Sequence, residues 1–111
     1  RAGTVSYKIL FTDTAREDLR EIAFRIAEIS KDRELAKRFV RELRDNCNIL
    51  ETFPEGGALP RDRILKSAGY RFLVYKDYLT FYTVDKEKAL VHILTVFNGK
   101  KDYMRVMGRY L

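Results

Sequence analysis

The N-terminal half of the chain combines a short β-forming run with two stretches of helical periodicity. Residues 5–11 alternate and are rich in β-forming types, which predicts a first strand. Apolar side chains then recur three and four positions apart in two stripes, which indicates two helices interrupted at 30–32. Because the interruption is short, we expect an antiparallel hairpin with both stripes facing one layer. The first stripe consists of Ala15, Leu19, Ile22, Ala23, Ile26 and Ile29, and the second of Leu35, Ala36, Phe39, Val40, Leu43, Cys47 and Leu50.

Particular residue types predict the two ends of this hairpin. The segment from Thr14 to Glu17 has the form of a capping box, in which a hydroxyl and a carboxylate each accept from the other's exposed backbone N–H. Pro54 and the pair Gly56-Gly57 are expected to end the second helix, because proline cannot continue a helix and glycine accepts turn conformations.

In the second half of the chain the apolar pattern changes to a period of two. Residues 70–75, 79–84 and 89–97 are rich in aromatic and β-branched types and are separated by short polar connections, which predicts an antiparallel meander. The last of these runs is apolar on both faces, so we expect it to be central in the sheet and covered by the hairpin. Residues 63–66 are a candidate extra strand, and the tail 100–111 is expected either as a short helix or as a loose end.

Composition narrows the class of protein. With 46% apolar and 34% charged residues, the chain of 111 residues is typical of one globular domain rather than a disordered segment. It has no apolar run long enough to span a bilayer and no signal-peptide pattern, so we expect no membrane association. Cys47 has no second cysteine to pair with, and together with the single His92 it makes no metal-ligand pattern. We therefore expect a cytoplasmic protein without a metal or another cofactor.

The net charge of +6 is unevenly placed along the chain. Residues 12–53 hold nine Lys or Arg and ten Asp or Glu, whereas the remainder holds thirteen against six. Because a solvated surface usually mixes the two signs, this asymmetry predicts a polyanionic ligand or an acidic partner.

Arg71 is the first candidate for chemistry. If the even-numbered residues of the strand 70–75 face the helices, alternation puts Arg71 on the open face of the sheet. Arg63 and the pair Lys100-Lys101 would share that face, and such a cationic surface with tyrosines at its rim suits a single-stranded phosphodiester backbone. The alternative is a structural Arg71, paired with Asp62, Asp77 or Asp102.

His92 is a candidate for acid–base chemistry by residue type alone. It lies inside an apolar run, without a second histidine or a nucleophile beside it, so we interpret it as a structural histidine in the core or at the sheet face.

Four segments in register carry a resemblance to a known family. They are Gly69–Tyr75 (Gly-Tyr-Arg-Phe-Leu-Val-Tyr), Leu79–Asp85 (Leu-Thr-Phe-Tyr-Thr-Val-Asp), the ending Val96–Tyr103, and Leu50–Pro54 with a glycine shortly after it, at position 56. Together they resemble the RelE/ParE toxins of type II toxin–antitoxin systems. The resemblance implies one α+β domain over residues 1–111, with an N-terminal strand, an antiparallel helical hairpin packed on an antiparallel sheet, and a short basic tail. It also implies a cognate antitoxin, an acidic or mixed peptide that wraps the toxin and masks its basic face.

The family divides into two activities. RelE-like members are mRNA interferases, ribosome-dependent and metal-independent endoribonucleases in which the 2′-OH attacks the adjacent phosphate. ParE-like members inhibit DNA gyrase and perform no chemistry. We predict the endoribonuclease, acting on mRNA on the ribosome. The alternative is the gyrase inhibitor, which the long hairpin over 13–53 favours.

For the nuclease, the resemblance implies roles at particular positions. Arg71 would stabilise charge on the scissile phosphate, Lys101 would be a second basic residue with Lys100 beside it, and Tyr103 would stack on a base or take part in proton transfer. Arg63 stands where the best-known pattern has lysine, and Lys66 is the neighbouring substitute, since an arginine stays protonated and is a poor general base. This pattern predicts that Arg71→Ala abolishes growth inhibition while leaving the fold intact.

Overall fold

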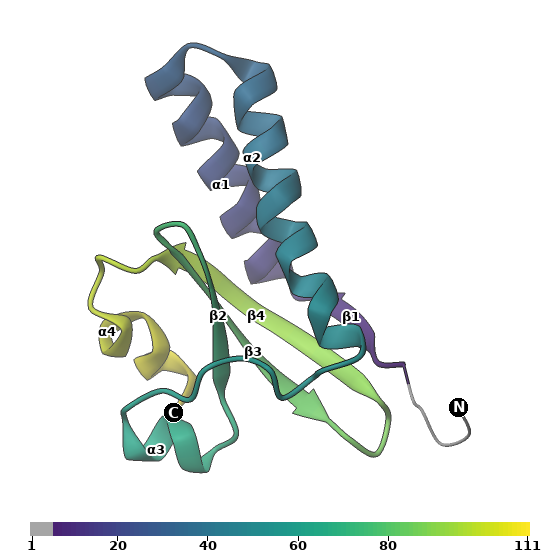
Figure 1. The fold of residues 1–111 in the computed structure, drawn as a ribbon. Coiled ribbons are helices and arrows are strands. Elements are labelled where there is room, and N and C mark those ends of the chain that lie inside the picture. The colour runs from purple at the N-terminus through teal and green to yellow at the C-terminus, as the bar shows by residue number, and fades with distance from the viewer. Residues whose placement is uncertain (1–5) are drawn as a thin grey trace.

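A four-stranded sheet organises the computed structural model, which describes residues 6–111 (Figure 1). The strand order is β1–β4–β3–β2, and the bounds are β1 Lys8–Phe11, β2 Arg71–Tyr75, β3 Tyr78–Asp85 and β4 Leu90–Asn98. Strands β2, β3 and β4 pair antiparallel, which confirms the predicted meander and the interior position of β4. Strand β1 pairs parallel with β4, a neighbour that local patterning did not identify.

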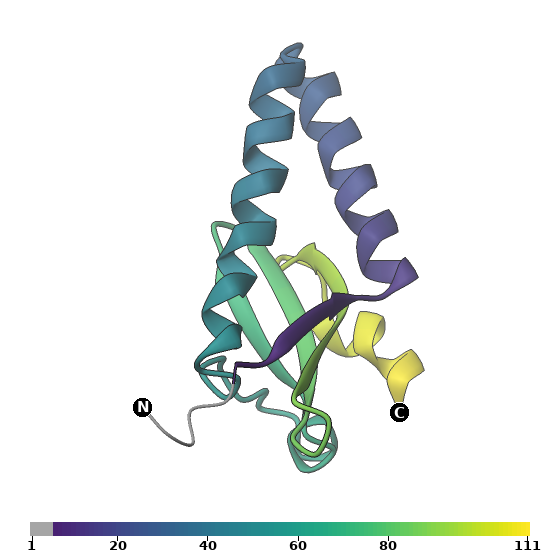
Figure 2. The ribbon, with the colours of Figure 1, turned by 90° about the vertical axis from the view of Figure 1, so that its right-hand side faces the viewer.

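The predicted helical hairpin is confirmed as α1 (Asp13–Ser30) and α2 (Arg33–Asp45), and α2 continues into the 3₁₀ helix η1 (Asn46–Glu51). Lys31 makes the reversal with a left-handed φ of 59°, and its N–H donates to the carbonyl of Ala27. Figures 1 and 2 show the hairpin extending beyond the sheet, so its tip has nothing to pack against. For this reason Ile29, predicted in the buried stripe, is 78% exposed. No helix in residues 6–111 has the length and apolar character needed to cross a bilayer.

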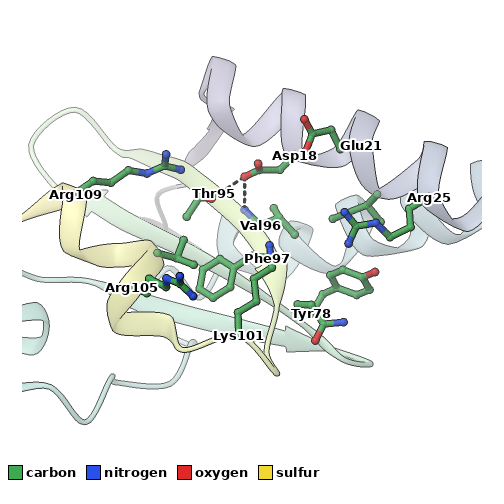
Figure 3. Close-up of a pocket in the computed structure, with 13 residues that line it drawn as sticks. Asp18, Glu21, Arg25, Tyr78, Thr95, Val96, Phe97, Lys101, Arg105 and Arg109 are labelled. Carbon is green, nitrogen blue, oxygen red and sulfur yellow. Dashed lines mark hydrogen bonds between the residues drawn. The ribbon is translucent and has the colours of Figure 1, made fainter.

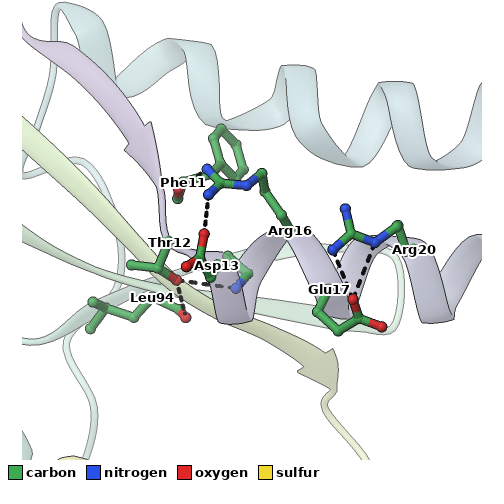
Figure 4. A network of polar contacts seen from close by, with 8 residues as sticks. Phe11, Thr12, Asp13, Arg16, Glu17, Arg20 and Leu94 are labelled. Atoms are coloured by element: carbon green, nitrogen blue, oxygen red, sulfur yellow. Dashed lines mark hydrogen bonds and ion pairs between the residues drawn. The ribbon is translucent and has the colours of Figure 1, made fainter.

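The capping box predicted at Thr14 is wrong by two residues. The N-cap is Thr12, whose hydroxyl accepts from the N–H of Ala15 and donates to the carbonyl of Leu94 in β4 (Figure 4). Glu17 instead pairs with Arg20 on the exposed side of the helix. The hydrogen bond from Thr12 to β4 explains why the cap is at Thr12, because α1 then begins where the chain is joined to the sheet.

Two apolar cores lie on opposite faces of the sheet. Consecutive strand residues such as Phe81 and Tyr82 divide between them, as alternation requires. The larger core joins the hairpin to the sheet through Ala15, Leu19, Ile22, Leu43, Cys47, Leu50, Tyr82, Val91, Ile93 and Val96. The smaller core holds Leu65, Phe81, Phe97 and Met107, with Tyr70, Phe72 and Tyr103 packed against them.

The smaller core explains the differences from the predicted second half. Residues 63–66 are not a strand but belong to the short helix α3 (Arg63–Ser67). The carboxylate of Asp62 caps this helix by accepting from the N–H of Leu65, and the side chain of Leu65 is buried in the smaller core. The tail forms α4 (Tyr103–Met107) and the 3₁₀ helix η2 (Gly108–Tyr110), anchored by the buried Met107. Of the two predictions for the tail, a short helix or a loose end, the helix is therefore confirmed.

Cys47 is buried in the larger core, and this burial raises the pKa of its thiol from 9.0 to about 12, against a smaller opposing effect of Arg44. A thiol whose pKa is higher in the folded state stabilises the fold fully below pH 9 and loses that contribution as the pH rises toward 12. We expect iodoacetamide to label Cys47 in urea at pH 8 and to label the native chain far more slowly, measured by mass spectrometry. Equal rates in the two conditions would contradict this burial.

Candidate functional site

Arg71 begins β2 and ties down the loop that precedes α3. Its Nη1 donates to the carbonyl oxygens of Glu55 at 3.1 Å and Gly57 at 3.0 Å. The N–H of Gly57 in turn donates to the hydroxyl of Tyr82 at 2.9 Å, and Tyr82 is the cross-strand partner of Arg71. The guanidinium therefore has a structural role in closing the loop over the larger core.

The prediction that Arg71 stands on an open sheet face is wrong. Leu73 shares its face and packs with the hairpin core, whereas Phe72 packs with the smaller core on the other side. The even-numbered residues therefore face away from the hairpin, and both faces carry a core. Arg71 makes no ion pair among the described residues, so the alternative pairings with Asp62, Asp77 and Asp102 are also wrong.

Arg71 and Lys66 line one cleft, together with His92 at the sheet face. Three cationic and three carboxylate side chains line it, so its charge is balanced: Lys66, Arg71, Lys86, Glu55, Asp85 and Glu87. The ammonium of Lys86 lies 2.8 Å from a Glu55 carboxylate oxygen, and this hydrogen bond lowers the pKa of Glu55. Two of the six charges thus neutralise each other, and the cleft is not a strong anion site.

The remaining predicted site residues lie elsewhere. Tyr103 packs its ring 6.1 Å from that of Phe81, and its hydroxyl accepts from the N–H of Asp62 at 3.3 Å, so it joins α4 to α3. Arg63 is exposed at the start of α3, and Lys100 is exposed in the turn after β4. Lys101 lines a second cleft that does not include Arg71.

The register of β3 separates these two clefts. Arg71 pairs with Tyr82, whereas Asn98, which precedes the Lys100-Lys101 turn, pairs with Tyr78. Four residues of a strand span about 13 Å, so Arg71 lies beside the middle of β3, whereas the basic turn lies beyond its first residue. The structure thus brings Arg71 together with Lys66, but not with Lys101 or Tyr103.

The second cleft lies between α1 and the C-terminal segment, and the sequence analysis missed it (Figure 3). Its cationic lining residues are Arg25, Lys101, Arg105 and Arg109, and its carboxylates are Asp18 and Glu21. The spacing of Lys101, Arg105 and Arg109, each four residues from the next, was an available signal for one cationic helical face. The contribution of Arg25 could not be anticipated, because it depends on how α1 lies against the tail.

The shortness of β1 creates this cleft. Strand β1 pairs only with residues 90–93 of β4, which leaves residues 94–98 without a strand partner on that edge. Asp18 of α1 covers part of this edge, since its Oδ2 accepts from the hydroxyl of Thr95 at 2.6 Å and from the N–H of Val96 at 2.9 Å. The floor of the cleft is therefore a strand edge with its backbone partly satisfied.

Within residues 6–111, no three His, Cys, Asp or Glu side chains converge in a way that could hold a metal ion.

Comparison with known families places the chain in context. The family model described as ParE toxin of type II toxin-antitoxin system, parDE, matches residues 9–103. No significant match was found among curated protein sequences.

Solved structures share the fold at low sequence identity. The chromosomal ParDE system from P. aeruginosa aligns with a TM-score of 0.69 and 18% identity, covering 84% of this chain and 96% of that one. The toxin–antitoxin complex RelBE2 from Mycobacterium tuberculosis gives 0.62 and 24%, covering 85% and 92%. A mutant of E. coli toxin RelE in the free state gives 0.54 and 19%, covering 96% and 100%.

Proposed function

Because the chain belongs to the ParE toxin family, and is thus a toxin of a type II toxin–antitoxin system, we propose that it inhibits DNA gyrase by binding, without performing chemistry. The sequence alone favours the ribosome-dependent endoribonuclease, whereas the arrangement of the candidate residues supports the inhibitor better.

The observation that carries this proposal is the separation of the candidate catalytic groups. General acid–base catalysis of phosphodiester cleavage needs a base, an acid and a phosphate ligand within hydrogen-bond reach of one substrate. Arg71 donates to two loop carbonyls, the hydroxyl of Tyr103 accepts from Asp62, and Lys101 lies in a different cleft from Arg71. Such a dispersed set supports a binding protein better than a nuclease.

The hairpin is a second feature in favour of inhibition by binding. Its tip extends beyond the sheet (Figure 2), so α1 and α2 present a long surface that neither core uses. A protruding rigid element of this kind suits insertion against a large protein target.

The endoribonuclease is retained as a second candidate on one observation. Lys66 and Arg71 line the same cleft, so a phosphate ligand and a second cation are adjacent there.

We also propose that a cognate antitoxin binds this chain. The excess of positive charge outside residues 12–53 favours a partner with acidic segments. The ParDE and RelBE2 structures that share the fold are described as a toxin–antitoxin system and complex.

The test is induction of the chain in bacteria, followed by plasmid topology and mapping of mRNA ends in the same cultures. We expect growth to stop, negative supercoiling to be lost and mRNA ends to stay unchanged. The purified chain should inhibit the supercoiling of relaxed plasmid by gyrase and should leave mRNA on ribosomes intact.

Tyr103→Phe is the variant that separates the two candidates. It keeps the ring that packs on Phe81 and removes only the hydroxyl, so the inhibitor should stay toxic. If the tyrosine took part in proton transfer, cleavage would fall by about 10²–10⁴-fold. Translation-dependent mRNA cleavage that disappears in folded Tyr103→Phe or Arg71→Ala would overturn the gyrase proposal.

A further inference from the structure

We propose that the outer face of α1 is a self-complementary surface through which two copies of the chain associate weakly. The two α1 helices run antiparallel, with Phe24 of both copies at the two-fold axis. This association goes beyond the proposed function, and gyrase inhibition does not depend on it.

An exposed aromatic ring marks the centre of this face. Phe24 is 69% exposed and belongs to neither core. The buried residues Ala15, Leu19 and Ile22 lie on the opposite side of the helix, because their spacing from Phe24 corresponds to rotations of roughly 140–180°. Figure 2 shows that one side of α1 is turned away from both α2 and the sheet. Phe24 thus has no role in the fold, and aromatic residues of this kind are enriched in protein interfaces.

The charges around Phe24 cancel. A shallow surface joins Phe24 to five charged side chains of α1, and the exposed Lys31 follows directly at the C-cap. Two copies of a chain of charge +6 repel each other over most of their surface, so they approach most easily through a neutral face. A uniformly acidic or basic partner would meet repulsion here as often as attraction. The three acidic and three basic residues are Glu17, Glu21, Glu28, Arg20, Arg25 and Lys31.

The signs are complementary about Phe24. In an antiparallel pair of helices with Phe24 at the axis, residues equally far before and after Phe24 lie level across the interface. Arg20, four positions before Phe24, is then level with Glu28 of the second copy, and Glu17, seven positions before, with Lys31 of the second copy. The two-fold axis repeats each pair, so four attractive pairs surround two stacked aromatic rings.

The groups that would form these pairs are available in the single chain. Arg20 donates to Glu17 through Nε and Nη2, and its Nη1 makes no hydrogen bond within residues 6–111. Glu28 and Lys31 make no ion pair within the same residues. The guanidinium can therefore keep Glu17 and also bind a carboxylate of the second copy, since it has donors on more than one edge.

Two features make the association weak. Glu21 would lie near Glu28 of the second copy, and Arg25, within four positions of both in the same helix, only offsets this repulsion. One face of an 18-residue helix also offers less contact area than the roughly 1,200–2,000 Å² that stable complexes bury. We expect a dissociation constant on the order of 100 µM. At lower concentrations the chain is monomeric and the face of α1 is uncovered.

The test is sedimentation velocity of the purified full chain from about 10 to 500 µM. The sedimentation coefficient of the natural sequence should rise with concentration toward that of a dimer. Arg20→Glu and Glu28→Arg each create like-charge pairs at two places, so each variant alone should associate at least about tenfold more weakly. An equimolar mixture of the two restores opposite charges at both places, and we expect it to form a heterodimer.

Matched controls separate this geometry from overall charge. Arg38→Glu and Glu34→Arg make the same two changes of net charge on α2, at exposed positions that do not line the Phe24 surface. Each should associate like the natural sequence, and mixing the two should add nothing. Phe24→Ala should weaken association about tenfold, whereas Ile49→Ala, which truncates an exposed apolar side chain on η1, should not. Thermal unfolding of every variant verifies that the fold is kept.

Three results would overturn the inference. A natural chain that stays monomeric to about 500 µM would exclude the association. A mixture of Arg20→Glu and Glu28→Arg that associates no better than either variant alone would exclude the antiparallel arrangement about Phe24. Equal effects of the α2 control variants would mean that net charge alone governs association. Because the measurement contains no gyrase, its outcome is independent of the proposed function.

Discussion

Replacing Phe81 with alanine should lower the free energy of unfolding by about 3–5 kcal/mol, which is a large part of the stability of a domain of this size. Phe81 is fully buried in the smaller core. Its ring centroid lies 5.2 Å from that of Phe72 and 5.6 Å from that of Phe97, with which it stacks. Removing it leaves a cavity under α3 and α4, which are too short to be stable without this contact.

Urea denaturation followed by circular dichroism measures this loss. The matched control is Val74→Ala in the neighbouring strand β2, where the side chain is 59% exposed and the change should cost well under about 1 kcal/mol. A Phe81→Ala chain as stable as the Val74→Ala chain would contradict the role assigned to the smaller core.

The second large effect is expected at Gly57. A Cβ at this position would lie 2.6 Å from the hydroxyl oxygen of Tyr82, 2.8 Å from its ring carbon Cε1 and 2.8 Å from the carbonyl oxygen of Phe72. The latter atom accepts the hydrogen bond from Ala58 that joins the loop to β2, so it cannot move freely. We expect Gly57→Ala to cost about 2–4 kcal/mol, through overpacking and through loss of the hydrogen bonds around Arg71.

Two further variants test the cause. Gly108→Ala adds a methyl group where no atom lies within 4 Å, at an ordinary helical φ, so its stability should stay close to that of the natural sequence. Tyr82→Phe removes the shortest of the three contacts, the one with the hydroxyl oxygen, but keeps the ring carbon at 2.8 Å, so it should recover only part of the lost stability when combined with Gly57→Ala. Full stability of Gly57→Ala alone would show that the loop can move away from β2 and that Arg71 does not hold it.

The sequence predicted the helices and strands better than it predicted which of them pair or pack together. Helical stripes and two-residue alternation are local properties, and they correctly predicted the hairpin and the meander. The position of β1 beside β4 depends on contacts between the two ends of the chain, which no local pattern records. Residues 63–66 are only a candidate strand by sequence, because a run this short fits either element, and the cap at Asp62 decides in favour of a helix.

The candidate site was harder to predict for the same reason. The face of the sheet predicted for Arg71 followed from an assumption that the even-numbered residues of β2 face the helices, and the second core reverses that assumption. Lys101 and Tyr103 are near each other in sequence, yet Tyr103 is turned inward by its contact with Phe81. Arg25 joins the basic tail only through the packing of α1, so the charge of the cleft is a tertiary property.

The parallel pairing of β1 with β4 also constrains how the chain matures during synthesis. The hydrogen bond from Thr12 to Leu94 joins positions 82 residues apart, so the sheet cannot close until almost the whole chain has been made. At about 5–20 residues per second, the ribosome needs roughly 4–16 s to translate that interval. Contacts of such large sequence separation also slow folding itself. During this time the apolar face of the hairpin has no sheet to cover it, and we expect the nascent chain to be both inactive and prone to aggregation.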